Sequence, residues 1–282
     1  MKFYMFILVL LMCILSHELS AKTDNIDSSD DELSWQLTGG IAGFYNPSIL
    51  KDDLEPEHLA KILNISLLVD LYYKGFFIQT DHRRVEGMAA SHEIGYQLVN
   101  KNKWGLDLLY KSYIYGFDPE LIAEYADVKN NILEGMTTRH DANGVGLRYS
   151  RFFDDAVLSM DVASIVSFSA GDDWVAEAFY SHLIPYKNWD LHLGVGLSYY
   201  TKDTVDYYLG IRPHEVNARR PEYEAEAGYR SEVEFLAQRP INENWMLNVG
   251  INHTHYDSSI RKSPIVKRNN VTVFTVGVLY AF

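Results

Sequence analysis

Two histidines near the end of the chain have a spacing that suits metal binding. His253 and His255 lie two positions apart, so on a strand their imidazoles would share one face. No third ligand is identifiable in the sequence, and both side chains fall toward the loop end of their segment. We therefore predict a pair at a rim or interface, and we expect neither a metal site nor a cofactor.

Hydroxyl groups close to histidines could form the nucleophile and base of a lipid hydrolase. Adjacent residues such as Ser91 and His92 would point to opposite faces of a strand, and no motif joins the candidates. The residues considered are Ser91, His92, Ser181, His182 and Ser198. We expect no enzymatic activity, and a lipid hydrolase of the outer membrane stays the second alternative.

A larger set of charged side chains alternates with apolar ones. A charge that faces lipid near the bilayer midplane costs about 2–4 kcal/mol for Arg or Lys, so these residues are predicted to face a wet lumen. The predicted lumen charges are Asp107, Lys111, Arg148, Asp161, Asp190, Glu224, Glu226, Arg230, Glu232 and Glu234, together with His192. Because opposite charges are intermixed, we favour a charged plug over a passage that favours cations.

The densest basic cluster lies in the last long connection. Arg261, Lys262, Lys267 and Arg268 bracket residues 263–266 and could meet lipopolysaccharide phosphates, or could belong to a solvated loop. The chain as a whole is acidic, with 38 acidic and 25 basic side chains and a net charge of -13. A general nucleic-acid binder, which needs a basic face, is therefore excluded.

Strands must position these groups, because alternation with a period of two recurs along the chain. From 189 to 199 one face reads Trp, Leu, Leu, Val, Leu, Tyr, and the other carries small or polar residues. The predicted strands span 33–45, 62–73, 75–82, 88–99, 103–115, 143–152, 155–169, 173–186, 188–201, 222–238, 243–256 and 271–282. No mature stretch has 18 consecutive apolar residues, so transmembrane helices are not expected.

Tight turns and long connections alternate between these strands. This is typical of an outer-membrane barrel, whose turns are short in the periplasm and whose outer loops are long. We predict an all-β fold, a transmembrane antiparallel up-and-down β-barrel of about twelve strands over residues 33–282, with both termini in the periplasm. The alternative is a water-soluble barrel or sandwich. A short capped helix is expected over 118–125, in the longest loop.

Aromatic residues support the membrane interpretation. Trp35, Trp104, Trp189 and Trp245 recur at the same end of four strands, as expected for an interfacial girdle. The last strand ends with Tyr280 and the terminal Phe282 on one face, which suggests the signal read by the outer-membrane assembly machinery through strand addition.

The beginning of the chain has the layout of an export signal. Lys2 precedes an apolar run that ends at Leu15, and small residues around Ala21 suggest cleavage, so residues 1–21 are predicted to be a signal peptide. Cys13 lies within it, and the mature chain would have no thiol. Residues 22–32 are predicted to be an acidic periplasmic leader.

Several short stretches resemble a known family. Residues 207–210, 220–225, 263–266 and the final 276–282 are similar to the MipA/OmpV family of MltA-interacting outer-membrane proteins. The resemblance implies an outer-membrane scaffold that holds two enzymes. One is a murein hydrolase of the lytic transglycosylase type, and the other is a peptidoglycan synthase. The first alternative is a narrow, porin-like channel for small solutes. The expected surroundings are outer-membrane lipid and lipopolysaccharide.

Overall fold

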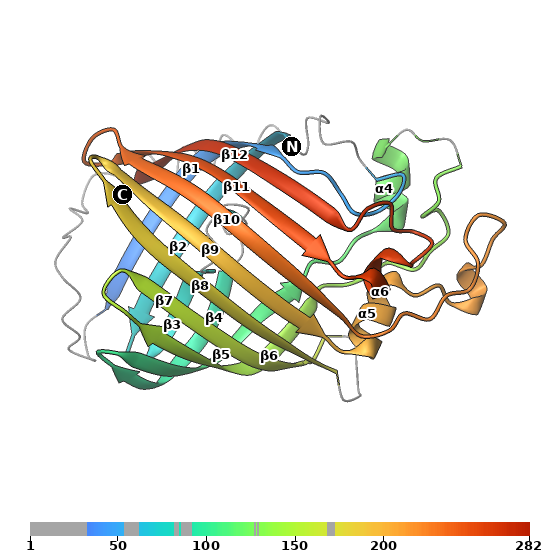
Figure 1. The fold of residues 1–282 in the computed structure, drawn as a ribbon, viewed down its shortest axis with the longest axis horizontal. Helices are drawn as coiled ribbons and strands as arrows, with labels where there is room; N and C mark the ends of the chain where they lie inside the picture. The colour runs from blue at the N-terminus through green and yellow to red at the C-terminus, as the bar shows by residue number, and fades with distance from the viewer. Residues whose placement is uncertain are drawn as a thin grey trace.

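Twelve antiparallel strands close into one barrel in the part of the chain that the structure describes (Figure 1). The computed structural model describes residues 33–53, 62–81, 85, 92–126, 128, 130–167 and 173–282. Each strand pairs with its neighbours in the sequence, and β1 closes the barrel against β12. The predicted up-and-down barrel is confirmed. The expected signal peptide (1–21) and leader (22–32) lie outside the described residues.

The strands match the twelve alternating segments closely. Their bounds are β1 Ser34–Tyr45, β2 Leu63–Tyr73, β3 Phe76–Thr80, β4 His92–Lys101, β5 Trp104–Ile114, β6 Ala142–Phe152, β7 Ala156–Ile165, β8 Trp174–Tyr186, β9 Trp189–Tyr200, β10 Gly228–Pro240, β11 Trp245–Tyr256 and β12 Asn270–Ala281. The helices are α4 Pro119–Ala126, α5 Lys202–Leu209, α6 Ser258–Arg261 and the 3-10 helix η1 Pro213–Glu215. None of these described helices is long and apolar enough to cross a membrane.

The alternation separates an apolar outer face from a polar inner one. In β9, Leu193, Val195 and Leu197 are exposed on the outside, while Ser198 is buried inside. Successive side chains of a strand point to opposite faces, so every strand contributes to both surfaces. The inside of the barrel thus contains buried polar and charged side chains next to apolar ones such as Phe77 and Leu236, and the exposed belt is apolar, as a lipid-facing surface requires.

Glycines of β9 make room for acidic side chains of β10. Gly196 lies opposite Glu232 and Gly194 lies opposite Glu234 in the ladder. A Cβ added at Gly194 would come 2.5 Å from the Glu234 Cγ, and one at Gly196 would come 2.5 Å from the Glu232 Oε1. The absence of side chains at Gly194 and Gly196 leaves room for the two carboxylates against this wall of the lumen.

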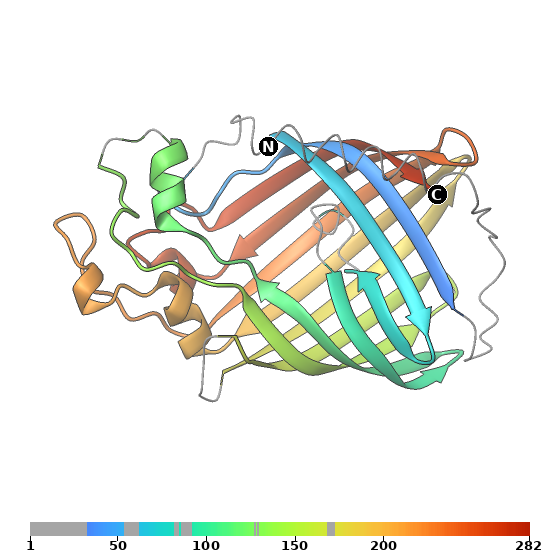
Figure 2. The same ribbon diagram turned by 180° about the vertical axis from the view of Figure 1, so that it is seen from behind.

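The two ends of the barrel differ in their connections. At one end, the turn end, five short turns join the strands, and β1 begins and β12 ends there. Lys74 and Lys187 adopt positive φ in two of these turns. At the other end, the loop end, lie the long connections and the helices (Figure 1). Figure 2 shows the same division from behind, with β1 and β2 toward the viewer.

One predicted strand begins later than expected. The alternation placed 222–227 in a strand, whereas β10 begins at Gly228. Pairing of Tyr223 with Ile211, and a hydrogen bond from the Ala225 backbone N–H to Asp206, hold this segment at the loop end instead. Glu224 and Glu226 therefore do not face the lumen. The Glu224 side chain is 73% exposed and pairs with a surface lysine.

The helix expected over 118–125 is confirmed as α4. The Asp118 carboxylate caps it by accepting hydrogen bonds from the backbone N–H groups of Glu120 at 2.9 Å and Leu121 at 3.3 Å. Ile122 packs against the buried cluster of the loop end, so α4 is attached to this end of the barrel (Figure 1).

Candidate functional site

A network of buried ion pairs fills one part of the lumen. Arg148 of β6 forms a double hydrogen bond with Glu93 of β4. The Lys111 ammonium of β5 lies 3.0 Å from Asp161 of β7 and 2.8 Å from Glu177 of β8. Five neighbouring strands thus each contribute one charge to this lumen network. Buried charges require such partners, because each would otherwise lose its hydration without compensation.

Neutral groups complete the lumen network. Tyr113 donates its hydroxyl to Asp161 at 3.0 Å, and Ser198 donates its hydroxyl to Glu177 at 2.8 Å. Gln79 donates to the Glu93 carboxylate. The described side chains around Lys111 leave a space of only about 10 Å³, which is about the room that one water needs.

A second acidic group lies on the wall formed by β10 and β11. Glu232 lies 3.9 Å from Arg230 and accepts a hydrogen bond from Asn252 at 3.4 Å. Glu234 accepts a hydrogen bond from the backbone N–H of Val85 at 3.2 Å. Val85 follows β3, across the barrel from β10, and is fully buried in a small apolar cluster. Val85 therefore lies inside the lumen.

The structure brings together only part of the predicted set of lumen charges. Lys111, Arg148 and Asp161 meet in the lumen network. Arg230, Glu232 and Glu234 belong to the second group. Among the described residues, no ion pair joins the two groups. Asp107 is half-buried on the inner side of β5. Asp190 shares its side of β9 with the buried His192, but it is exposed because it lies at the turn end.

The sequence analysis missed two acidic members of the lumen network. Glu93 sits opposite the apolar face of β4 that includes Ile94, so the period-two pattern could have identified it. Glu177 shares the inner face of β8 with the apolar Val175 and Phe179. Because this face is not uniformly polar, the alternation does not identify Glu177 as facing inward. Their pairing with Arg148 and Lys111 depends on the order of strands around the barrel.

A cavity of about 230 Å³ opens the lumen toward the turn end. Asp154 and Asp155, in the turn between β6 and β7, lie at its edge, and His192 and Ser181 line it further in. Phe179 lines both this cavity and the small space beside Lys111. The cavity therefore extends from the turn end to the edge of the lumen network.

The long connections at the loop end, which we call the loop cap, pack into a buried cluster that continues into the barrel wall. The loop cap comprises the described residues of 46–53, 115–141, 201–227 and 257–269. Buried apolar side chains from all four connections pack together there: Leu50, Ile132, Leu133, Met136, Val205, Tyr208, Leu209, Ile211, Ala225, Ile260, Ile265 and Val266. Hydrophobic burial thus holds loops that are far apart in the sequence over the outer mouth.

A buried ion pair links two of these loops. The Arg139 guanidinium donates to both oxygens of Glu215, at 2.9 and 2.8 Å, and both side chains are fully buried. Burial alone would raise the pKa of the Glu215 carboxyl, but hydrogen bonds from Arg139, Thr137 and the Arg212 backbone hold it well below its ordinary value. Arg220 donates to the backbone carbonyls of Glu215 and Ile132, and its burial lowers its pKa.

The histidine pair and the described hydroxyl candidates lie on different strands, β11 for the pair and β8 and β9 for Ser181 and Ser198. His253 and His255 lie on the outer face of β11, where their rings contact Thr272 and Asn270 of β12 at 2.8 Å. In the described residues no group of three or more metal-binding side chains occurs. Ser181 lines the turn-end cavity, whereas His182 lies on the opposite side of β8 and stacks on Tyr180. Ser91 lies outside the described residues.

The predicted girdle tryptophans all lie at the turn end. Trp35, Trp104, Trp189 and Trp245 are each the first or second residue of an odd-numbered strand. The Trp245 ring packs edge-on against Tyr280, at 5.0 Å between centroids, and Tyr280 packs likewise on Phe282 at 4.9 Å. The terminal residue is joined to β1 by a hydrogen bond from its backbone N–H to the Leu37 carbonyl.

The basic cluster of the last loop lies at the loop end, around α6. Arg261 and Lys262 are exposed, and Lys267 and Arg268 are half-buried. Arg261 donates to the Val266 carbonyl at 3.1 Å, which folds the loop back on itself.

Comparison with known proteins identifies the family. The family model described as MltA-interacting protein MipA matches residues 39–282. The chain belongs to the MipA family. This confirms the resemblance found in the short stretches of the last third of the chain.

Relatives of this MipA family chain are outer-membrane proteins. Omp26La of Vibrio anguillarum is 26% identical over 152 residues, which are 54% of this chain and 59% of the relative. OmpV of Vibrio cholerae serotype O1 has the same identity and coverage. The chain thus spans less than two thirds of the length of these relatives.

Two solved structures match most of the chain at low TM-score. The NanC porin has a TM-score of 0.37 and 8% identity, and the match covers 88% of this chain and 99% of that one. The trimer form of OmpT from Vibrio cholerae has a TM-score of 0.40 and 7% identity, covering 89% and 100%.

The barrel, its apolar outer belt and these relatives place the protein in the outer membrane. Outer-membrane barrels have short turns in the periplasm and long loops outside. The turn end is therefore periplasmic, and the first and last strands start and finish there.

Proposed function

We propose that this protein is an outer-membrane anchor that holds a lytic transglycosylase, and through it a peptidoglycan synthase, at the periplasmic face. The family description, MltA-interacting protein, names the kind of partner. The barrel would present the partner with the turn end, since only this end faces the cell wall.

The ion-paired lumen network, together with the packed loop cap, is the observation that carries the proposal. Charged side chains from five neighbouring strands meet in the lumen network, and buried apolar side chains of four connections pack together at the loop end. A barrel built in this way serves poorly as a wide diffusion pore. A scaffold needs no open lumen, because it binds its partners through the exposed surface at the end of the barrel.

Two exposed apolar side chains at the turn end suit a protein contact. Ile241, in the turn between β10 and β11, is 59% exposed, and Phe153, in the turn between β6 and β7, is 51% exposed. Apolar and aromatic side chains are the usual anchors of protein interfaces, where they bury their surface against the partner. We take Ile241 and Phe153 as the first anchors to test.

The test is a binding measurement between the purified barrel in detergent and a periplasmic lytic transglycosylase. Ile241→Asp and Phe153→Asp are each expected to weaken binding by at least about 1 kcal/mol. Leu121→Asp is the matched control, because Leu121 is 51% exposed but lies in α4 at the loop end. Absence of binding by the native chain, or equal loss in the control, would contradict the proposal.

A narrow channel is the second candidate, and the turn-end cavity favours it. The cavity of about 230 Å³ already reaches the lumen network from the periplasm. Conductance in planar bilayers separates the two functions, since a closed scaffold gives no open-channel steps. In a channel gated by the network, Arg148→Met would increase the conductance because it releases Glu93 from its partner.

The proposal includes no catalysis. Ser181 and His182 lie on opposite faces of β8, and Ser198 donates its hydroxyl to a carboxylate in the lumen network. Incubation with phospholipid or lipid A tests this part, and release of fatty acid would overturn it.

A further inference from the structure

Basic side chains gather at the turn end, although the chain as a whole is acidic. The five turns, with two strand residues on either side of each, contain six basic and four acidic side chains, against 25 and 38 in the whole chain. We call the six the turn-end cationic belt: Lys74, Lys101, Lys103, Arg151, Lys187 and Arg239. The acidic ones are Asp154, Asp155, Asp190 and Glu243.

Four members of the belt lie over aromatic rings. Lys74 lies 5.4 Å from the Tyr73 ring centroid, and Lys187 lies 5.2 Å from that of Tyr186. Arg151 lies 5.9 Å from the Phe153 ring, and Arg239 lies 5.5 Å from the Trp189 ring. Rings hold these cations by cation–π attraction while their polar groups stay accessible.

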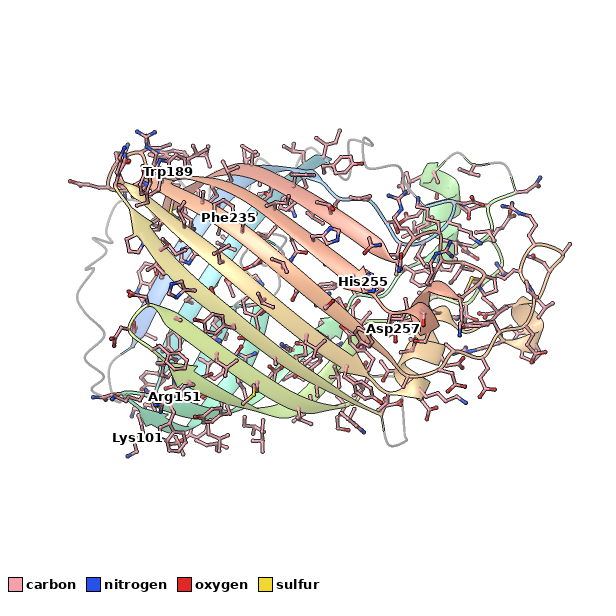
Figure 3. All side chains as sticks on the ribbon, in the orientation of Figure 1. Lys101, Arg151, Trp189, Phe235, His255 and Asp257 are labelled. Atoms are coloured by element: carbon pink, nitrogen blue, oxygen red, sulfur yellow. The ribbon has the colours of Figure 1, made fainter. Side chains whose placement is uncertain are left out.

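Three members of the belt, Lys101, Arg151 and Arg239, face outward on the same side as the lipid-facing residues. Lys101 and Arg151 both pair across the ladder with Trp104, an outward-facing girdle residue. Arg239 shares the outer face of β10 with Phe235. Figure 3 shows Lys101, Arg151 and Trp189 at the turn end, with Phe235 farther along the wall of the barrel.

The charge of most of the belt is not neutralised within the protein. In the described part of the chain, five of the six members form no ion pair with a carboxylate: Lys101, Lys103, Arg151, Lys187 and Arg239. Arg151, Lys187 and Arg239, which lie over aromatic rings and have no carboxylate partner among the described residues, can therefore take an external anion.

We propose that the turn-end cationic belt binds the phosphate headgroups of anionic phospholipids in the periplasmic leaflet of the outer membrane. A lipid is favoured over a soluble partner because Lys101, Arg151 and Arg239 lie on the outer face, where acyl chains can follow the apolar wall next to each headgroup. Arginine also matches phosphate by forming two hydrogen bonds at once. The proposal does not depend on the scaffold function.

Native mass spectrometry of the full-chain barrel in detergent micelles tests it. The probes are phosphatidylglycerol, which is anionic, and phosphatidylethanolamine, which is zwitterionic. The native protein is expected to prefer phosphatidylglycerol. The double variant Arg151→Gln/Arg239→Gln is expected to lose about fivefold in affinity for it per charge removed, or about 25-fold in all.

A second double variant, Arg261→Gln/Lys262→Gln, removes the same charge from the loop end and should keep the preference. The heat-dependent gel mobility of each variant reports whether the barrel has folded. Equal binding of the two lipids by the native protein would overturn the proposal, and so would an equal loss in the loop-end variant. Retained lipid preference in the turn-end variant, with lost binding to isolated peptidoglycan sacculi, would assign the belt to the cell wall and also overturn it.

Discussion

The two ends of this barrel use charge in opposite ways. At the loop end, Arg139 and Glu215 are buried and bound to each other inside a packed cap. At the turn end, Arg151 and Arg239 lie over aromatic rings on the outer face and have no carboxylate partner among the described residues. The buried pair at the loop end stabilises the protein itself, whereas the cations at the turn end remain available to bind an external anion.

The difference shows that one set of strands can support two kinds of surface. Long connections contain enough residues to bury an apolar core, and a charge trapped in that core needs a partner. Short turns cannot form a core, so their side chains stay at the rim, where water and headgroups solvate them. Substitutions at the two ends should therefore have unequal effects.

The largest effect is expected from Arg139→Ala. It leaves the Glu215 carboxylate buried without its cation, which costs about 3–5 kcal/mol of stability in the loop cap. Limited proteolysis should cut residues 130–141 and 210–223 much faster, while the gel mobility of the folded barrel stays unchanged.

Arg219→Ala is the matched control, because its ion pair with Asp52 lies at the surface and its side chain is 52% exposed. A change of at most about 1 kcal/mol is expected there. If both variants are cut equally fast, the loop cap does not depend on the buried pair.

Acidification should loosen the loop end selectively. The pKa of Glu215 is lowered in the folded protein, so its contribution to stability is complete above the ordinary value of 4.5 and is lost as the pH falls below it. Amide hydrogen exchange, corrected for the intrinsic exchange rate at each pH, should give lower protection factors around Thr137 and Glu215 at pH 3 than at pH 6. In Glu215→Gln this change should be absent, and an unchanged pH response in that variant would contradict the assignment.

At the turn end, Asn242→Ala should have a smaller effect. Its side-chain oxygen accepts hydrogen bonds from the backbone N–H groups of Asn244 at 3.0 Å and Trp245 at 2.9 Å. Their loss should lower the free energy of unfolding by about 1 kcal/mol in urea titrations of the barrel in micelles. Glu243→Ala, in the same turn, serves as the control. A larger effect than that of Arg139→Ala would reverse the comparison between the two ends.

The smallest effect is expected from Lys202→Ala. Lys202 pairs with Glu224 at 2.6 Å, but both side chains are exposed, so water replaces the lost contact. No measurable change in the thermal unfolding of the loop cap is expected. A clear decrease would show that surface pairs also hold the cap.

The strands were predictable because their signal is local. In β9 the apolar and polar faces alternate from Trp189 to Tyr199, and each face can be identified from neighbouring residues alone. The tight turns and the capped helix α4 were equally visible, since a turn or a cap depends on a few adjacent residues.

The lumen network was only partly predictable. Lys111, Arg148 and Asp161 were identified as inward-facing, but Glu93 and Glu177, which bind the two cations, were not. The opposite error occurred at Glu224 and Glu226. Their alternation continued that of β10, although contacts with Ile211 and Asp206 keep the segment in the loop cap.

The sequence by itself determined the number of strands, the two faces of each and the order of short and long connections, because period-two patterning and turn chemistry act between neighbours in the chain. Only the tertiary structure decided which charges meet in the lumen, where β10 begins and how four loops share one core. Those contacts join residues 50 to 200 positions apart in many cases, and their geometry exists only after the barrel has closed and fixed the register of every strand.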